Sequence, residues 1–226
     1  MISLRLNKIN MLVKQPQIIP AFLTDSIEVL VDQVERVSPF VDKIHIDVLD
    51  GYFAPYITCC PAPQIAAVDF LVDYEVHLMV EDPKEQLMSW KKAGATRVIA
   101  HVEVLEDQES FVEMASSLGL EVGLALKVET DLDELSDSVA SNLDSILLMA
   151  HEVGVQGAPF NDEVLLRIVD LRSRYEHVII QVDGGLNEET LHMSFDAGAN
   201  LFAVGSTIVE SPKPEEVIAS LRKIIA

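Results

Sequence analysis

The sequence predicts an α/β fold, a closed (β/α)8 or TIM barrel, from three observations. Apolar segments of strand length alternate with segments of helix length, in eight strand–helix units. The 226 residues, 49% of them hydrophobic, can bury one large α/β core. An Ala-Gly-Ala phrase follows a helical segment at Gly94 and again at Gly198, as similar units would place it. An open doubly wound sheet is the main alternative, but the glycine-rich turn usual after its first strand is absent.

Apolar, β-branched segments mark the strands, and caps and breakers mark the helices between them. The strands are predicted at 17–22, 45–49, within 70–80, 96–101, 121–126, 144–149, 177–182 and 200–204. Thr24-Asp25-Ser26 caps a helix that runs to about Ser38. Asp82-Pro83 opens a helix that ends at Gly94, and the next helix ends at Gly119.

The second half of the chain continues this order. A short helix is predicted at 131–140. A longer helix at 161–174 has an apolar face that includes Val169. Asn187 caps the helix after the seventh strand, and a last helix runs to Ile225. Between the second and third strands, residues 52–63 are rich in proline and aromatic residues and show no period, so they predict an ordered loop of the kind that often covers a site.

Residues 1–16 are interpreted as an N-terminal extension, and residues 17–226 as a single barrel domain. The extension scatters Arg5, Lys8 and Lys14 among apolar residues. It has neither a compact hydrophobic region nor a small-residue cleavage site, so we do not interpret it as a signal peptide.

Composition and charge exclude several classes of function. The net charge of −21, from 37 acidic against 16 basic residues, leaves no basic stripe for a nucleic acid. No apolar run reaches the roughly 18 residues that span a bilayer, so no membrane partner is expected. Cys59 and Cys60 are adjacent and form no disulfide framework, and free thiols suggest a cytoplasmic location.

The second predicted strand carries two polar residues, His45 and Asp47, on one face, because residues two apart share a face. His77 lies on the third strand and Asp183 ends the seventh, and the carboxyl ends of barrel strands hold catalytic groups. Two imidazoles with two carboxylates suit one divalent ion, Zn²⁺, Fe²⁺ or Mn²⁺. Each residue alone has a structural interpretation: a buried ion pair, a core histidine or a turn former. Their joint occurrence favours the metal site.

Glycines after the sixth, seventh and eighth strands form a second pattern. They are Gly154, Gly157, Gly184, Gly185 and Gly205, the last followed by Ser206. Barrel loops seven and eight, with a helix N-terminus, commonly bind phosphate, although tight turns alone also require glycine. Such local donors are needed here, because the acidic chain does not attract an anion at long range.

The remaining histidines divide by position. His101 ends the fourth strand, where it either reaches the rim or faces water, and His151 lies in the loop after the sixth strand, near the predicted site. His177 and His192 are expected at the surface.

Four motifs together resemble the ribulose-phosphate 3-epimerase family, in register from about Ile19 to the C-terminus. They are His45-Ile46-Asp47-Val48-Leu49-Asp50-Gly51, Val76-His77-Leu78-Met79, Val182-Asp183-Gly184-Gly185-Leu186-Asn187 and Val204-Gly205-Ser206. The resemblance implies a ribulose-phosphate-binding barrel with one divalent metal. It implies metal ligands at His45, Asp47, His77 and Asp183, with His77 also counted among the substrate-binding residues. It implies Asp47 and Asp183 as the two acid/base carboxylates, and Leu49, Met79 and Met149 as apolar residues that close over the sugar.

Three departures make this chain a divergent member. Ala21 stands where the family usually has serine, Tyr56 is a bulky replacement in the loop after the second strand, and the loop at 153–158 keeps two of three glycines. These changes concern the identity of the sugar phosphate more than the metal chemistry.

The expected activity is inversion of C3 of a ketopentose phosphate, D-ribulose 5-phosphate to D-xylulose 5-phosphate, through an enediolate. The alternatives are epimerisation of a related ketose phosphate such as allulose 6-phosphate, a sugar-phosphate lyase on the same barrel, or a non-catalytic sugar-phosphate-binding protein. A lyase would be expected to place lysines at strand ends, where only Lys43 and Lys127 lie close. The expected partner is a small sugar phosphate, and a homo-oligomer is expected.

Overall fold

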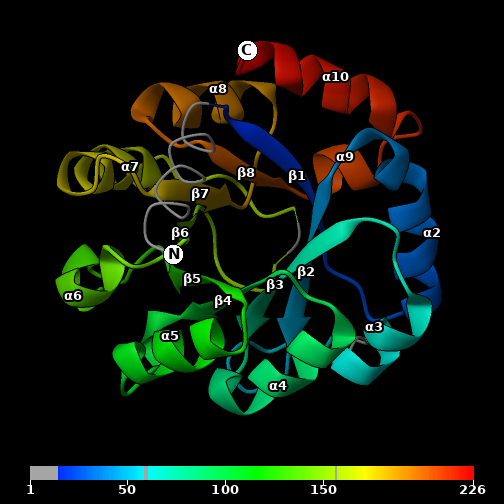
Figure 1. Ribbon diagram of the computed structural model, residues 1–226. Helices are drawn as coiled ribbons and strands as arrows, with labels where there is room; N and C mark the ends of the chain where they lie inside the picture. Colours follow the sequence, from blue (N-terminus) through cyan, green and yellow to red (C-terminus); the bar gives the residue numbers. More distant parts are fainter. Residues whose placement is uncertain (1–14, 59–60, 156) are drawn as a thin grey trace.

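A computed structural model describes residues 15–58, 61–155 and 157–226, and in it eight parallel strands close into a barrel in the order β1-β2-β3-β4-β5-β6-β7-β8. The helices surround this barrel (Figure 1). The strands are β1 (Gln17–Phe22), β2 (Lys43–Leu49), β3 (Asp73–Met79), β4 (Arg97–His101), β5 (Glu121–Leu126), β6 (Ser145–Met149), β7 (Ile179–Asp183) and β8 (Leu201–Val204). Because β8 pairs with β1, the sheet has no open edge, and the predicted barrel is confirmed over the doubly wound alternative.

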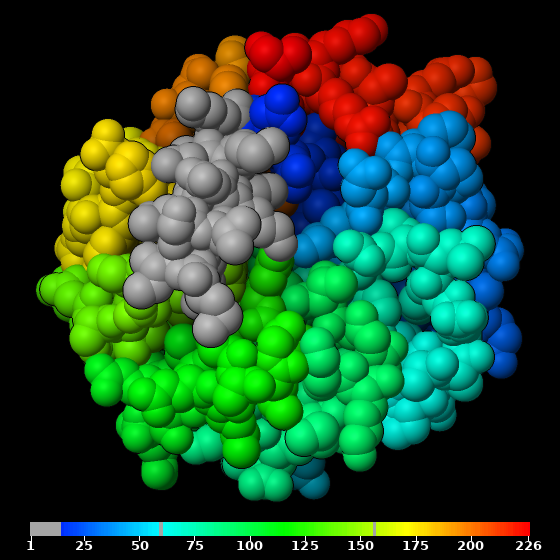
Figure 2. All heavy atoms as spheres, viewed as in Figure 1, coloured from blue at the N-terminus to red at the C-terminus, as the bar shows by residue number. Residues whose placement is uncertain are grey.

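The helices follow the strands in turn, and consecutive units lie side by side around the molecule, as the colours in Figure 2 show. The helices are α2 (Ile27–Val37), α3 (Ala62–Val68), α4 (Pro83–Ala93), α5 (Gln108–Ser117), α6 (Asp137–Ala140), α7 (Glu163–Arg174), α8 (Glu188–Ala197), α9 (Ser206–Val209) and α10 (Pro214–Ile224). Within the described part of the chain, none of them combines the length and apolar character that a membrane span requires.

The predicted helix boundaries at caps are confirmed. The Ser26 side chain accepts from the amide of Val29 and caps α2. Asn187 forms a capping box with Thr190 at the start of α8. Gly94 and Gly198 end α4 and α8 with left-handed φ values of 98° and 113°.

Four predictions about helices are wrong. Helix α3 begins inside the segment predicted as loop, because its alanines and prolines show no helical period. The helix predicted at 131–140 is a 3₁₀ turn, Leu132–Glu134, followed by the single turn α6. The last helix is divided into α9 and α10, since Pro212 and Pro214 lie at the break. Val169 is 53% exposed on α7, whereas Ile168 is buried.

Among the described residues, hydrophobic clusters lie on both faces of the barrel. The outer core packs the strands against the helices and includes Val76, Trp90 and Phe111. The interior is partly apolar, with Ile99 and Leu147 among its residues, but several buried polar side chains lie on the same inward face of the strands. These polar residues form the candidate site and its support.

Parts of two predictions lie outside the described residues. These are residues 1–14 of the predicted extension, and Cys59 and Cys60.

Candidate active site

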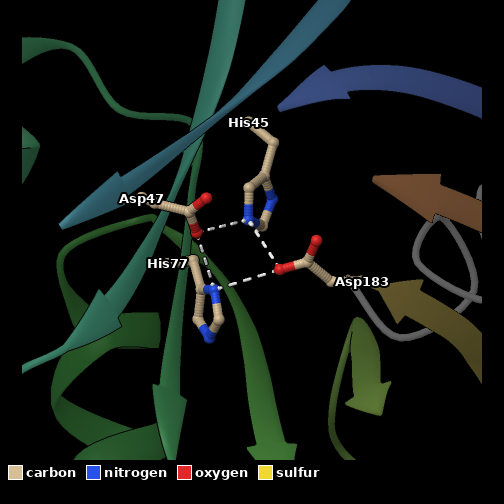
Figure 3. A group of neighbouring side chains, drawn as sticks. All are labelled: His45, Asp47, His77 and Asp183. Carbon is tan, nitrogen blue, oxygen red and sulfur yellow. Dashed lines mark hydrogen bonds and ion pairs between the residues drawn. The ribbon is translucent and has the colours of Figure 1, made fainter. Parts of the chain in front are cut away.

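His45, Asp47, His77 and Asp183 meet at one end of the barrel interior (Figure 3). All four are buried, and one ligand-type atom from each lies within 4.8 Å of the others. The strand register places Asp47 beside His77 on β2 and β3, while Asp183 comes from β7 across the barrel. Side chains that are remote in sequence therefore face a common point.

The separations between these atoms fit a small divalent cation. His45 Nε2 lies 3.2 Å from Asp47 Oδ1 and 3.9 Å from Asp183 Oδ2. His77 Nδ1 lies 3.0 Å and 3.7 Å from the same two oxygens. A tetrahedral ion with bonds of about 2.0–2.2 Å holds its ligands roughly 3.4 Å apart. The donor set of two nitrogens and two oxygens therefore fits the ion in chemistry and in size.

The His45 ring is oriented by a carboxylate behind it. Its Nδ1 lies 2.7 Å from Glu75 Oε1, and because a carboxylate only accepts, Nδ1 carries the hydrogen. Nε2 then faces Asp47 and Asp183. Burial acts to lower the pKa of His45, but the Asp47 and Glu75 carboxylates raise it well above the ordinary value. This environment favours positive charge at Nε2, as a bound cation requires.

A chain of two further groups orients the His77 ring. His77 Nε2 lies 2.9 Å from His101 Nε2, and His101 Nδ1 lies 3.0 Å from Glu103 Oε2. Glu103 must accept from Nδ1, so Nε2 of a neutral His101 accepts, and His77 Nε2 donates to it. Burial lowers the pKa of His101 to about 4, which keeps this ring neutral. His77 Nδ1 therefore faces Asp47 Oδ1 and Asp183 Oδ2, and this nitrogen would be the one to bind a cation once its hydrogen is lost.

Glu75 and Glu103 are themselves held by hydrogen bonds. Glu75 Oε2 accepts from Arg97 at 2.8 Å, and its Oε1 accepts from Gln181 at 2.6 Å. Burial acts to raise the pKa of Glu75, yet Arg97 and His45 lower it to about 2. Burial likewise opposes ionisation of Glu103, but His101, Thr130 and the Lys127 amide lower its pKa to about 2. Both supporting carboxylates are ionised.

Sequence reasoning missed Glu75, Arg97, Gln181 and Glu103. The missed signal was strand alternation, since Glu75 lies two residues before His77 and Gln181 two before Asp183. Glu75 and Gln181 therefore point into the barrel, one layer below His77 and Asp183 respectively. His101 reaches the site instead of facing water, as one of its two predicted positions required.

The two aspartates have pKa values displaced in opposite directions. Burial acts to raise the pKa of Asp47, but His45 and His77 lower it below its usual range. Burial and the neighbouring Asp47 raise the pKa of Asp183. Two carboxyl groups pushed apart in this way can act as a base and an acid on one substrate.

A cavity opens beside the cluster formed by His45, Asp47, His77 and Asp183. Among its lining residues are Asp47, Asp183, Met79, Met149, His151, Gly154, Gly157, Gly184, Gly185, Gly205 and Ser206. Every residue predicted from the glycine pattern to contact phosphate thus borders the same space as the two aspartates.

Several predicted residues lie elsewhere. His77 is buried beside the cavity and is not among its lining residues, and Leu49 packs under the loop at Gly154. His177 and His192 are exposed, as predicted.

Comparison with known proteins gives one consistent family. The model of the ribulose-phosphate 3 epimerase family matches residues 17–209. A ribulose-phosphate 3-epimerase of Schizosaccharomyces pombe is 32% identical, with 93% of this chain and 94% of that protein covered. The cytoplasmic isoform from Oryza sativa is 30% identical, with 92% of this chain and 94% of that protein covered.

Solved structures show the same fold at low identity. KGPDC from Streptococcus mutans, solved in complex with D-R5P, has a TM-score of 0.74 at 13% identity, covering 93% of this chain and 97% of that chain. A 3-hexulose-6-phosphate synthase has a TM-score of 0.69 at 22% identity, covering 93% and 99%.

Proposed function

This chain belongs to the ribulose-phosphate 3-epimerase family, and we propose that Asp47 and Asp183 are the acid and base with which it inverts C3 of D-ribulose 5-phosphate to form D-xylulose 5-phosphate. One observation carries the proposal. Two aspartates from different strands lie close together beside two buried histidines, at the wall of a cavity that the glycine loops also line.

The four clustered residues would hold one divalent cation. The mixed nitrogen and oxygen donors fit Zn²⁺, Fe²⁺ or Mn²⁺. When bound, such an ion supplies Lewis acidity that stabilises negative charge on the substrate oxygens. His45 and His77 are oriented for this task by Glu75 and His101, as their hydrogen bonds require.

The two carboxyl groups divide the proton transfers. The C3 hydrogen is acidic because C3 lies next to the ketone, and its removal leaves a planar enediolate. Asp47, with its lowered pKa, removes the proton from one face, and Asp183, with its raised pKa, returns one to the other face. The reverse reaction exchanges the two roles. Inversion therefore requires carboxyl groups on opposite sides of the substrate, which β2 and β7 supply.

The glycine loops bind the phosphate in this proposal. Gly184 and Gly185 precede α8, and Gly205 and Ser206 begin α9, so backbone N–H groups are available at this side of the cavity. A net charge of −21 repels a phosphate at a distance, and these local donors would offset that repulsion. Met79 and Met149 line the wall against which the sugar carbons lie.

The test is hydrogen exchange at C3 with the metal-loaded protein. Wild-type protein in D₂O should incorporate deuterium at C3 of ribulose 5-phosphate and form xylulose 5-phosphate. Asp47→Asn and Asp183→Asn should each abolish epimerisation, because each removes one of the two proton-transfer groups. Wild-type turnover that survives in both variants would refute the assignment. Allulose 6-phosphate, assayed in parallel, identifies the preferred ketose phosphate.

Two further expectations belong to the same proposal. The relative from Oryza sativa is a cytoplasmic isoform, which supports the cytoplasmic location that we propose for this chain. We also propose a homo-oligomer, and light scattering coupled to size-exclusion chromatography would measure its mass. A mass near 25.0 kDa would contradict it.

A further inference from the structure

His151 lies in the loop after β6, and its side chain lines the same cavity as the two aspartates and the glycines proposed to bind phosphate. Neither the ligand cluster nor its supporting hydrogen bonds involve it.

The His151 ring is held in place on two sides. Its Nδ1 donates to the carbonyl oxygen of Glu152 at 2.7 Å. Its opposite edge packs on Gly184, where an added Cβ would lie 2.5 Å from His151 Cδ2 and 2.9 Å from Nε2. Gly184 also has a φ of 113°, in the region that favours glycine. The His151 ring therefore occupies the space that a side chain at position 184 would fill.

In the proposed binding mode, the place of Gly184 in the chain indicates which part of the substrate the ring meets. Asp183 precedes it and would act at C3, and Gly185 follows it in the loop proposed to bind phosphate. In ribulose 5-phosphate, the only carbon between C3 and the carbon that carries the phosphate is C4, which bears a hydroxyl group. In that binding mode, a ring that packs on Gly184 would lie beside C4 of the substrate.

The free nitrogen of the ring matches that hydroxyl group. With the Nδ1 hydrogen donated to Glu152, Nε2 of the neutral ring is an acceptor. Among the described residues, none donates a hydrogen bond to it. A sugar hydroxyl is a donor, whereas a phosphate dianion has no hydrogen to donate.

From these contacts we infer that His151 is a specificity-determining residue, whose Nε2 accepts a hydrogen bond from the C4 hydroxyl of the ketopentose phosphate. The inference rests on the proposed function and deepens it. His151 selects for substrates that carry a hydroxyl next to the inverted carbon, on the side of the phosphate.

A substrate-by-variant comparison tests this contact. His151→Phe keeps a ring against Gly184 and removes both nitrogens, and His192→Phe is the matched control on the exposed face of α8. D-ribulose 5-phosphate and its 4-deoxy analogue are compared by KM, and by calorimetric Kd. His151→Phe should weaken binding of ribulose 5-phosphate roughly three- to tenfold, the value of one hydrogen bond. Binding of the 4-deoxy analogue should not change, and His192→Phe should match wild type with both compounds.

Other outcomes overturn the inference in distinguishable ways. If His151→Phe weakens binding of ribulose 5-phosphate and of its 4-deoxy analogue equally, or weakens neither, then Nε2 does not bind the C4 hydroxyl. Non-phosphorylated ribulose tests whether His151 binds the phosphate instead. In that case His151→Phe would not weaken binding of ribulose, but it would still weaken binding of the 4-deoxy phosphate. Wild-type protein without C3 exchange would overturn the proposed function and this inference together. A melting temperature shared by wild type and His151→Phe excludes misfolding, and His151→Gln, which keeps an acceptor, should recover part of the affinity.

Discussion

At the scale of single residues, the two histidines of the buried cluster present different nitrogens to the same point, Nε2 from His45 and Nδ1 from His77. The difference follows from their supports, because Glu75 accepts from one ring and His101 accepts from the other. Each support accepts the hydrogen of one ring nitrogen, so the other nitrogen of that ring faces the point where a cation would bind. The orientation of the two rings therefore depends on Glu75 and His101, which lie outside the cluster of four.

The His101–Glu103 pair gives the first prediction. Glu103→Ala removes the acceptor of the His101 Nδ1 hydrogen, so His101 no longer has a fixed tautomer and His77 loses its orientation. Metal affinity should fall roughly 10- to 100-fold. Competition against a chromophoric chelator with Zn²⁺ and Mn²⁺ measures the effect without an activity assay.

Two matched variants control this experiment. Glu106→Ala changes an exposed glutamate nearby in the chain and should leave the affinity unchanged. Glu103→Gln keeps an oxygen that can accept from His101, so it should recover part of the loss. If Glu103→Ala binds metal as tightly as wild type, then the orientation of His77 does not depend on the hydrogen bonds through His101 and Glu103.

At the scale of the elements, the start of α8 positions the loop that contains Gly184 and Gly185. Asn187 accepts from the amides of Glu189 at 2.9 Å and Thr190 at 3.1 Å, which satisfies two of the four amides exposed at a helix start. The Thr190 hydroxyl donates to the Gly185 carbonyl at 3.0 Å. The cap thus connects helix stability to the geometry of the proposed phosphate loop.

Removal of that cap gives the second prediction. Asn187→Ala should lower the free energy of unfolding by about 1 kcal/mol, because both amide contacts lose their acceptor. Urea denaturation followed by circular dichroism measures it. Asn187→Asp retains a capping oxygen and should stay close to wild type. An equal loss in both variants would mean that the side-chain oxygen is not the stabilising group.

Interstrand contacts inside the barrel give the third prediction. Arg97 on β4 binds Glu75 on β3 at 2.8 Å and Glu121 on β5 at 3.0 Å, and its own side chain is 4% exposed. Arg97→Met leaves the Glu75 carboxylate buried without its cation, which should cost about 3–5 kcal/mol of unfolding free energy.

The matched control is Arg174→Met, which breaks surface pairs with Asp170 and Asp133 and should cost no more than about 1 kcal/mol. Adding Glu75→Gln to Arg97→Met should restore part of the stability, since the uncompensated charge is removed. If the double variant is less stable than Arg97→Met alone, the loss does not come from the buried charge.

At the scale of the whole molecule, the sequence predicted what depends on local pattern. Strand length, caps and the spacing of His45 and Asp47 are local, and they led to the barrel and to the side chains that meet in it. Contacts across the barrel are not local. Gln181 and Glu75 form a hydrogen bond although 106 positions separate them in the sequence, and no short sequence pattern predicts such a pair. Helix α3 was missed for a different reason, because tertiary packing of Ile65 stabilises a segment without helical period.

The closed barrel concentrates negative charge at one point, and this leads to the fourth prediction. Asp47 and Asp183 lie buried together in an acidic chain, so a divalent cation that binds between them should stabilise the folded protein. Metal at about 100 times its Kd should add about 2.7 kcal/mol to the free energy of unfolding. Thermal melts of chelator-treated protein, with and without Zn²⁺ or Mn²⁺, measure the shift. In a protein that carries both Asp47→Asn and Asp183→Asn, the same metal should add far less, because the two charged ligands are gone. A shift of equal size in both proteins would place the stabilising ion elsewhere on the molecule, and the acid/base pair would then work without the cation assigned to it.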